Sequence, residues 1–173
     1  MKHRVLYYMV DGSTEAGQAA LDTIEGGNQI ELMGCAHEPN VCPTAEQLAG
    51  CEGFVGEFGP VDDACADAMA ATGMRIVSNM SIGLNHVAVD RLASHGITVT
   101  NCPGYCSDDV AQHAIALMLD LMRQVTFLNR DVRDGIWNPM GGYIMHRTQG
   151  RTLGLAFLAA SRAPWHPSHR RSA

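Results

Sequence analysis

The chain has 173 residues, 46% hydrophobic and 17% charged, which is enough to bury one complete core and the start of a second. No apolar run reaches the roughly 18 residues of a membrane span, and Lys2, His3 and Arg4 lead into an ordinary strand rather than a signal core, so we expect a cytoplasmic protein without a membrane partner. All eighteen Asp and Glu precede residue 150, together with eight of the twelve Lys and Arg, so residues 1–150 carry a net charge of −10. This acidic charge argues against a surface that binds nucleic acid. The last 23 residues carry a net charge of +4.

Five short apolar runs recur at nearly even spacing, and each is brief enough for a buried parallel strand. They cover residues 5–10, 29–33, 53–58, 74–78 and 97–100. Helix-like stretches separate them at residues 13–24, 44–50, 61–73 and 87–96, with Ser13 or Thr14 capping the first and Gly50, Gly73 and Gly96 closing the others. Because parallel strands need helical crossovers, residues 1–100 are predicted to form an α/β fold with a doubly wound parallel sheet.

A longer helix is predicted over residues 107–128, with Ser107 as its N-cap and Asp108 and Asp109 in its first turn. Its apolar positions are so broadly distributed that we expect burial on more than one side, between two domains or in a dimer interface. Residues 129–149 read as a polar, Gly-rich connection, and residues 150–155 (GRTLGL) as the first strand of a nucleotide-binding domain.

Three stretches then carry a family resemblance. Residues 75–124 (RIVSNMSIGLN to LMRQ), 129–139 (NRDVRDGIWNP) and 150–155 (GRTLGL) resemble the D-isomer-specific 2-hydroxyacid dehydrogenases. The motif NHV at residues 85–87 is similar to the D-lactate dehydrogenase branch. The resemblance implies a flavodoxin-like substrate domain over residues 1–100, a crossing helix and connection over 101–149, and the start of an incomplete NAD(P)-binding Rossmann domain at 150–173. It also implies a small 2-oxo or 2-hydroxy acid as substrate.

The loop that follows the fourth predicted strand is the main candidate site. Ser81, Ile82 and Gly83 stand at the carboxyl end of a parallel sheet, where successive backbone N–H groups can bind an anion. The resemblance implies that these main-chain amides bind the substrate carboxylate; a plain turn between strand and helix is the alternative. Two positions depart from many members of the family, which carry a basic residue in place of Asn79 and an Asp in place of Ala88.

A second candidate region begins at the turn Pro103-Gly104. The resemblance implies that Tyr105 faces the cleft between the domains and contacts the substrate, while Gln112 stands where Glu is usual. His113 lies one turn into an apolar helix, which favours a packed, hydrogen-bonded histidine over a catalytic acid. The acid/base histidine of the family lies in the other domain.

Two further candidates are weaker. Cys35, His37 and Cys42 could hold a metal ion, but their spacing is irregular, so no metal site is predicted and the six cysteines are expected to be reduced. Asp11 after the first strand occupies the place of a phosphoacceptor in receiver domains, yet the adjacent Gly12-Ser13 favours a turn and a helix cap.

Hydride transfer requires a glycine loop for the cofactor, a cation and a histidine tuned by a carboxylate. The positions of the family's catalytic Arg, Glu and His are absent from this sequence, so no catalytic residue is assigned. No glycine follows Gly154, so no cofactor-binding residue is assigned. NAD or NADP is therefore expected in a full-length parent and not in this chain, which is expected to be an inactive substrate-binding half. A non-catalytic dimerisation module using the helix at 107–128 is the alternative.

The abrupt change after Leu155 suggests a reading-frame hypothesis. Residues 156–163 (AFLAASRA) can be encoded so that a neighbouring frame reads Leu-Leu-Gly-Arg-Ile-Ala-Arg-Ala, close to the Gly-x-Gly-Arg-Ile loop of the family. A frameshift near Leu155 would also account for the basic end. Resequencing the locus tests this, because a downstream frame without a Rossmann-like continuation contradicts it.

Overall fold

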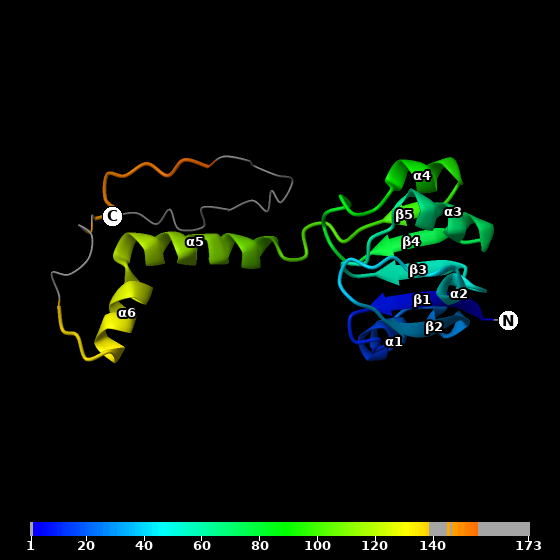
Figure 1. The fold of residues 1–173 in the computed structure, drawn as a ribbon, viewed down its shortest axis with the longest axis horizontal. Helices are drawn as coiled ribbons and strands as arrows, with labels where there is room; N and C mark the ends of the chain where they lie inside the picture. The colour runs from blue at the N-terminus through cyan, green and yellow to red at the C-terminus, as the bar shows by residue number, and fades with distance from the viewer. Residues whose placement is uncertain (1, 139–144, 146, 156–173) are drawn as a thin grey trace. The chain divides into compact units, whose positions relative to one another are not determined.

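The computed structural model of the protein describes residues 2–138, 145 and 147–155. The chain forms two units, Met1–Pro103 and Gly104–Ala173 (Figure 1). Within the described residues, the first unit contains a five-stranded sheet with its crossover helices, and the second contains two further helices. Among the described residues, no helix combines the length and the apolar character needed to cross a membrane.

The sheet of the first unit is parallel throughout, with strand order β2-β1-β3-β4-β5. Its strands are β1 (His3–Met9), β2 (Ile30–Ala36), β3 (Gly53–Gly56), β4 (Ile76–Asn79) and β5 (Thr98–Thr100). Each overlaps one of the five apolar runs, so the predicted doubly wound α/β fold is confirmed. This strand order is that of flavodoxin-like sheets.

The crossover helices are α1 (Glu15–Leu21), α2 (Ala45–Leu48), α3 (Asp63–Ala71) and α4 (Val89–Ser94), and a short 3-10 helix, η1 (Gly27–Gln29), precedes β2. All four α-helices are shorter than the stretches that the sequence suggested. Local chemistry sets their ends. Thr44 forms a capping box with Gln47, and the Asp62 carboxylate accepts a hydrogen bond from the Cys65 amide at 2.8 Å. Gly50, Gly73 and Gly96 have φ of 72°, 82° and 74°, as expected for residues that close helices.

The two faces of the sheet are covered unequally. On one face, strand residues such as Leu6, Phe54 and Val77, which lie opposite one another, pack with α2, α3 and α4 in a single core. On the other face, α1 approaches β1 and β2 so closely that a Cβ at Gly17 would lie 2.8 Å from atoms of Tyr7 and Leu32. Ile76 on β4 keeps 41% of its surface exposed, so cover of this second face is incomplete within the described residues.

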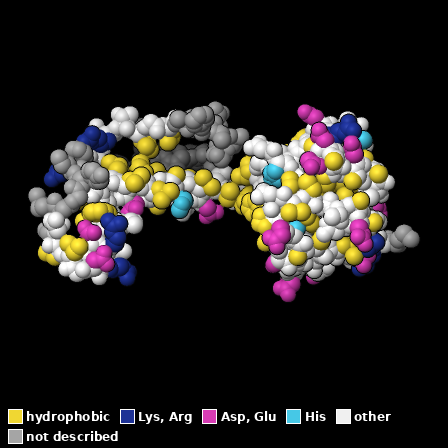
Figure 2. Space-filling view, in the orientation of Figure 1, with side chains coloured by type: hydrophobic (Ala, Val, Ile, Leu, Met, Phe, Trp, Pro, Cys, Tyr) yellow, Lys and Arg dark blue, Asp and Glu magenta, His cyan; other side chains and the backbone are white. Residues whose placement is uncertain are grey.

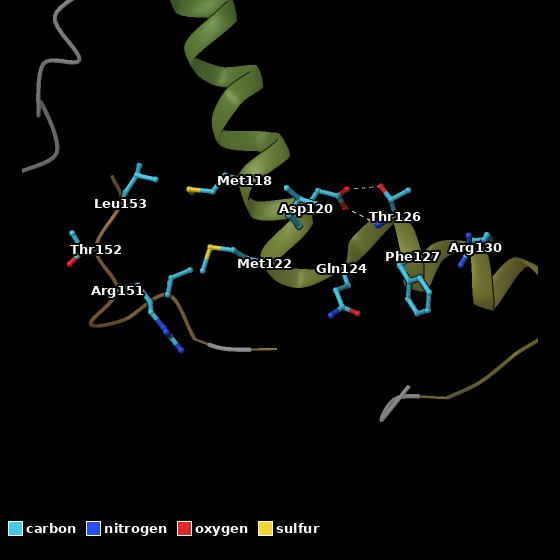
Figure 3. A pocket seen from close by; sticks show the side chains of 12 residues that line it. Met118, Asp120, Met122, Gln124, Thr126, Phe127, Arg130, Arg151, Thr152 and Leu153 are labelled. Carbon is cyan, nitrogen blue, oxygen red and sulfur yellow. Dashed lines mark hydrogen bonds between the residues drawn. The ribbon is translucent and has the colours of Figure 1, made fainter. Parts of the chain in front are cut away.

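The second unit differs from the single helix predicted over residues 107–128. Helix α5 (Ser107–Arg123) ends where Gln124 adopts a left-handed φ of 52°, and α6 (Val125–Arg133) begins at the next residue. The Asp120 carboxylate caps α6, accepting from the Thr126 amide and hydroxyl at 2.8 Å each (Figure 3). Hydrophobic periodicity continues across this break, which is why the sequence did not reveal it. Helix α6 also occupies part of the connection predicted over residues 129–149.

The start of α5 corrects the expectation, whereas burial of this helix between two domains or in a dimer stays a prediction. Ser107 is the first helical residue and not the N-cap, which is Cys106. Ser107 is the only buried residue of α5, so the helix is not buried on several sides within the described chain. His113 is exposed, and the expectation of a packed histidine is therefore wrong. An apolar stripe shows that a helix needs cover, but not that the same chain provides it.

Residues 150–155 do not form the predicted strand. Gly150 has a φ of 77°, the Arg151 amide donates to the Thr148 carbonyl at 3.1 Å, and Leu155 is 69% exposed. A strand is defined by pairing with a second strand, and none of the described residues pairs with this segment. The proposed out-of-frame tail at 156–173 lies outside the described residues.

An ion-pair cluster joins α3 to α4. The Asp67 carboxylate accepts from Arg91 Nε and Nη2 at 2.6 and 2.8 Å, and it lies 2.7 Å from His95 Nε2. Hydrogen bonding by Arg91, and secondly by His95, lowers the pKa of Asp67 from 3.8 to about 2. The cluster is exposed, so water screens it and its contribution to stability is small.

We predict that Asp67→Asn lowers the melting temperature by at most about 5 °C at neutral pH. Because folding lowers the pKa of Asp67, its contribution is complete well above pH 3.8 and is lost as the pH falls through 3.8 towards 2. Urea unfolding of wild type and variant over this pH range measures the difference in free energy of unfolding. Glu25→Gln, at an exposed position between α1 and η1, is the control, and a difference that does not shrink in acid contradicts the prediction.

Candidate functional site

The loop between β4 and α4 lies at the carboxyl edge of the sheet, as the sequence predicted. Its first end is held by the Met80 amide, which donates to the Gly56 carbonyl at the end of β3 at 2.9 Å. Its second end is held by a parallel bridge between Val61 and Val87. The intervening residues therefore start and finish on fixed backbone.

Three successive carbonyls of this loop accept hydrogen bonds from the body of the unit. The Ser81 carbonyl accepts from the Cys102 amide at 3.1 Å, and the Ile82 carbonyl accepts from Asn101 Nδ2 at 2.8 Å. The Gly83 carbonyl accepts from Asn79 Nδ2 at 2.8 Å and from Ser81 Oγ at 3.0 Å. Each peptide group is thus fixed by a donor that belongs to β4, to its following loop or to the chain after β5.

The amides of the same peptide groups are left available. In a planar trans peptide the N–H of the next residue points opposite to the carbonyl, so Ile82, Gly83 and Leu84 direct their N–H groups away from these donors. Within the described residues, none of these three amides donates to another group. Successive unpaired N–H groups on a fixed backbone form an anion-binding arrangement.

Gly83 leaves this side of the loop open. Its φ is not positive, so its backbone conformation does not require glycine. A Cβ built at Gly83 would meet no heavy atom within 4 Å. Neither backbone strain nor a neighbouring atom therefore requires glycine at this position, and the space beside it is open.

The residues that hold the loop were not recognised as functional in the sequence. Asn79 is only 3% exposed, and its amide group bonds to Ser81, Gly83 and His86. The sequence showed only that Asn79 replaces a basic residue. A polar residue at the end of a buried strand was the available signal, because a buried amide needs partners.

Tyr105 lies in the second unit, apart from the unit that carries this loop, and it is 66% exposed. Its contact with the substrate stays a prediction. Gln112 and His113 are also exposed residues of the second unit. The described site therefore consists of Ser81, Ile82 and Gly83, extended to the amide of Leu84.

A hollow of about 350 Å³ lies beside the loop at the same edge of the sheet. Its lining includes Tyr7 and Met9 of β1, Asp11, Glu57 and Met80, the residue that precedes the loop. The Asp11 carboxylate accepts from the Ser13 amide at 2.9 Å, as expected for the predicted turn. Ligands of open α/β sheets bind at this edge, outside the carboxyl ends of the strands.

Among the residues considered as metal ligands, His37 packs against other groups of the protein. The His37 ring stacks on Tyr8 with centroids 4.1 Å apart, and its Nδ1 lies 2.8 Å from the Glu38 carbonyl. No group of three His, Cys, Asp or Glu side chains among the described residues could hold a metal ion. Burial raises the pKa of the Cys65 thiol to about 12, so this thiol is unreactive at neutral pH.

Comparison with known proteins relates the chain to one family. The family model for the catalytic domain of D-isomer specific 2-hydroxyacid dehydrogenases matches residues 10–163. A glyoxylate reductase of Korarchaeum cryptofilum is 30% identical over 148 residues, which cover 82% of this chain and 43% of the relative. A D-lactate dehydrogenase of Streptococcus agalactiae is 26% identical over 108 residues, covering 62% of this chain and 32% of the relative.

Solved structures support the same fold. The apo-structure of D-lactate dehydrogenase from Escherichia coli aligns with a TM-score of 0.55 and 20% identity, covering 80% of this chain and 43% of that one. The chain thus spans less than half the length of these relatives.

We predict that Gly83→Val abolishes anion binding while leaving the fold intact. The added side chain enters space that no protein atom fills, so the melting temperature stays within about 2 °C of wild type, but it obstructs the Ile82 and Leu84 amides. Amide NMR spectra recorded with increasing oxamate, an unreactive analogue of a 2-oxo acid, report binding. A Kd raised by about tenfold or more is expected. Unchanged binding by this variant contradicts the assignment of the loop.

Proposed function

Because the chain belongs to the D-isomer specific 2-hydroxyacid dehydrogenase family, we propose that it is the substrate-binding part of an NAD(P)-dependent oxidoreductase. The full-length parent would transfer hydride between NAD(H) and a small 2-oxo or 2-hydroxy acid. Residues 1–100 form the substrate domain in this proposal, residues 101–149 the crossing helix and connection, and residues 150–173 the start of the cofactor domain with its altered tail. In this proposal the protein acts in the cytoplasm.

The observation that carries the proposal is the set of unpaired amides at Ile82, Gly83 and Leu84. A carboxylate is the common feature of 2-oxo and 2-hydroxy acids, and N–H groups that donate to a charged oxygen make stronger hydrogen bonds than neutral pairs do. Because the loop carbonyls are already bonded, the amides need no rearrangement to receive it. The loop would fix the carboxylate end of the substrate and leave its C2 atom free to react.

The described residues do not fit NAD(P). Dinucleotide binding needs a glycine-rich turn between a buried strand and a helix. Residues 151–155 are exposed and unpaired here, and the sequence has no glycine after Gly154. We therefore assign no catalytic step and no cofactor contact to this chain.

We predict that the 173-residue chain binds oxamate but does not oxidise NADH or NADPH in the presence of glyoxylate or pyruvate. The loop supplies carboxylate donors, whereas the polarising cation and the proton-exchanging histidine of the reaction are not assigned. The loss of cofactor absorbance measures turnover, and Gly83→Val is the control. Turnover by the wild-type chain that Gly83→Val abolishes would show that the chain is an active enzyme.

A second candidate function is a non-catalytic assembly module that uses residues 107–128. Hydrophobic side chains gather along α5 (Figure 2). Leu117, Leu121 and Val125 are 52%, 79% and 58% exposed. A hollow of about 1080 Å³ lies beside Leu121, and its lining includes Met118 and Met122 of α5, Phe127 of α6 and residues 148 and 151–153 (Figure 3). Exposed apolar surface of this kind favours association with a second copy.

We predict that the wild-type chain sediments as a homodimer and that Leu121→Glu sediments as a monomer, because the variant places a charge in the apolar surface. Gln112→Glu adds the same charge at an exposed polar position of α5 and should remain dimeric. Sedimentation equilibrium over a range of concentrations gives the mass. A wild-type mass that stays monomeric throughout contradicts assembly through this helix.

A further inference from the structure

We propose that Asn79 is a positioning residue that holds the carboxylate-binding loop in its receptive conformation. This inference rests on the proposed function, because it explains how the amides of that loop are aimed. Asn79 touches no substrate in this proposal and acts through Ser81 and Gly83. The neighbouring strand residues in the core are apolar. The fold alone therefore does not explain why a polar, uncharged side chain is buried at position 79.

The hydrogen bonds of Asn79 fix the direction of its side-chain amide. Its Nδ2 donates to Ser81 Oγ at 2.6 Å and to the Gly83 carbonyl at 2.8 Å. A carbonyl can only accept, so the reversed orientation would set Oδ1 against the Gly83 oxygen. The remaining atom, Oδ1, lies 3.2 Å from His86 Nε2, which must carry the proton to donate here. Every polar group of this buried side chain is thereby satisfied.

Two routes lead from Asn79 to the Gly83 peptide. One is the direct bond from Nδ2, and the other passes through the Ser81 hydroxyl, which accepts from Asn79 and donates to the Gly83 carbonyl at 3.0 Å. With the Gly83 carbonyl held on this side, the Leu84 amide must point to the other. Because both hydrogen bonds of the Ser81 hydroxyl are made within the loop, the Ser81 side chain stabilises the loop.

The loop folds around Asn79 from both ends. Ser81 and Gly83 contact its Nδ2, whereas His86 contacts its Oδ1 and accepts from the Val61 amide through its own carbonyl at 2.9 Å. Asn101 completes the arrangement from the end of β5 by holding the Ile82 carbonyl. Asn79 is the member of this network that contacts both halves of the loop.

The proposal distinguishes hydrogen bonding from simple filling of space. Asn79→Asp preserves the shape of the side chain but replaces both Nδ2 donors with an acceptor, which the Gly83 carbonyl cannot bond. The Gly83 peptide would turn, and the Leu84 amide would leave the binding side. The exposed Asn28→Asp makes the same change of charge away from the loop and is the matched control.

The test uses the full 173-residue chain, labelled with nitrogen-15 and titrated with oxamate. In wild type and Asn28→Asp, the amide signals of Ile82, Gly83 and Leu84 should move together with one Kd. In Asn79→Asp, these signals should already differ without oxamate, and the Kd should rise at least about tenfold. Ser81→Ala keeps the direct Nδ2 bond to Gly83, and it should show a smaller rise than Asn79→Asp.

The outcomes separate the two proposals. If oxamate moves the wild-type amides and Asn79→Asp responds with the same Kd, the positioning role is wrong while the proposed function stands. If oxamate does not shift the amide signals of the wild-type chain, the proposed function fails. The positioning role is then decided by the spectra without oxamate. Gly83 and Leu84 amide signals that are unchanged in Asn79→Asp would overturn it.

A measurement on the wild-type chain covers the case in which Asn79→Asp does not fold. Both Nδ2 protons of Asn79 are bonded and buried, so they should exchange with deuterated water at least about tenfold more slowly than those of the exposed Asn28. Equal exchange rates would show that the bonds from Asn79 to the loop do not persist in solution, and would overturn the proposal.

Discussion

The parallel pairing of the five strands is the constraint on which the rest of the first unit depends. Strands that run in one direction end at one edge, so the loop after β4 meets both the end of β3 and the chain that follows β5. The Gly56 carbonyl, Asn101 and the Cys102 amide all reach the loop from these neighbouring ends. Residues far apart in sequence thus fix consecutive peptide groups.

The chemistry of the site follows from which polar groups the fold satisfies and which it leaves open. The donors Asn79, Asn101 and Cys102 bond the carbonyls of the loop, and the planarity of the peptide then turns the Ile82, Gly83 and Leu84 amides outward. No charged side chain takes part in this network among the described residues. The proposed anion binding at this loop would therefore be a property of the backbone, directed by neutral side chains.

Local sequence patterns predicted much of this architecture. The five strands and four crossover helices appear where apolar runs, caps and terminal glycines indicated, and Ser81, Ile82 and Gly83 lie at the expected edge. The failures occur where a single side chain or a missing partner decides the structure. Gln124 breaks a helix whose periodicity is continuous, and residues 151–155 remain unpaired although they resemble a buried strand.

The sequence by itself determined the fold class, the family resemblance and the loop that carries the candidate site, because these depend on periodicity and on short motifs. Only the tertiary structure decided how that loop is held. It placed Asn79, His86 and Asn101 around the same peptide groups and left the Leu84 amide available. Hydrogen bonds between β4, the chain after β5 and their loops depend on strand order and burial, which no local pattern encodes.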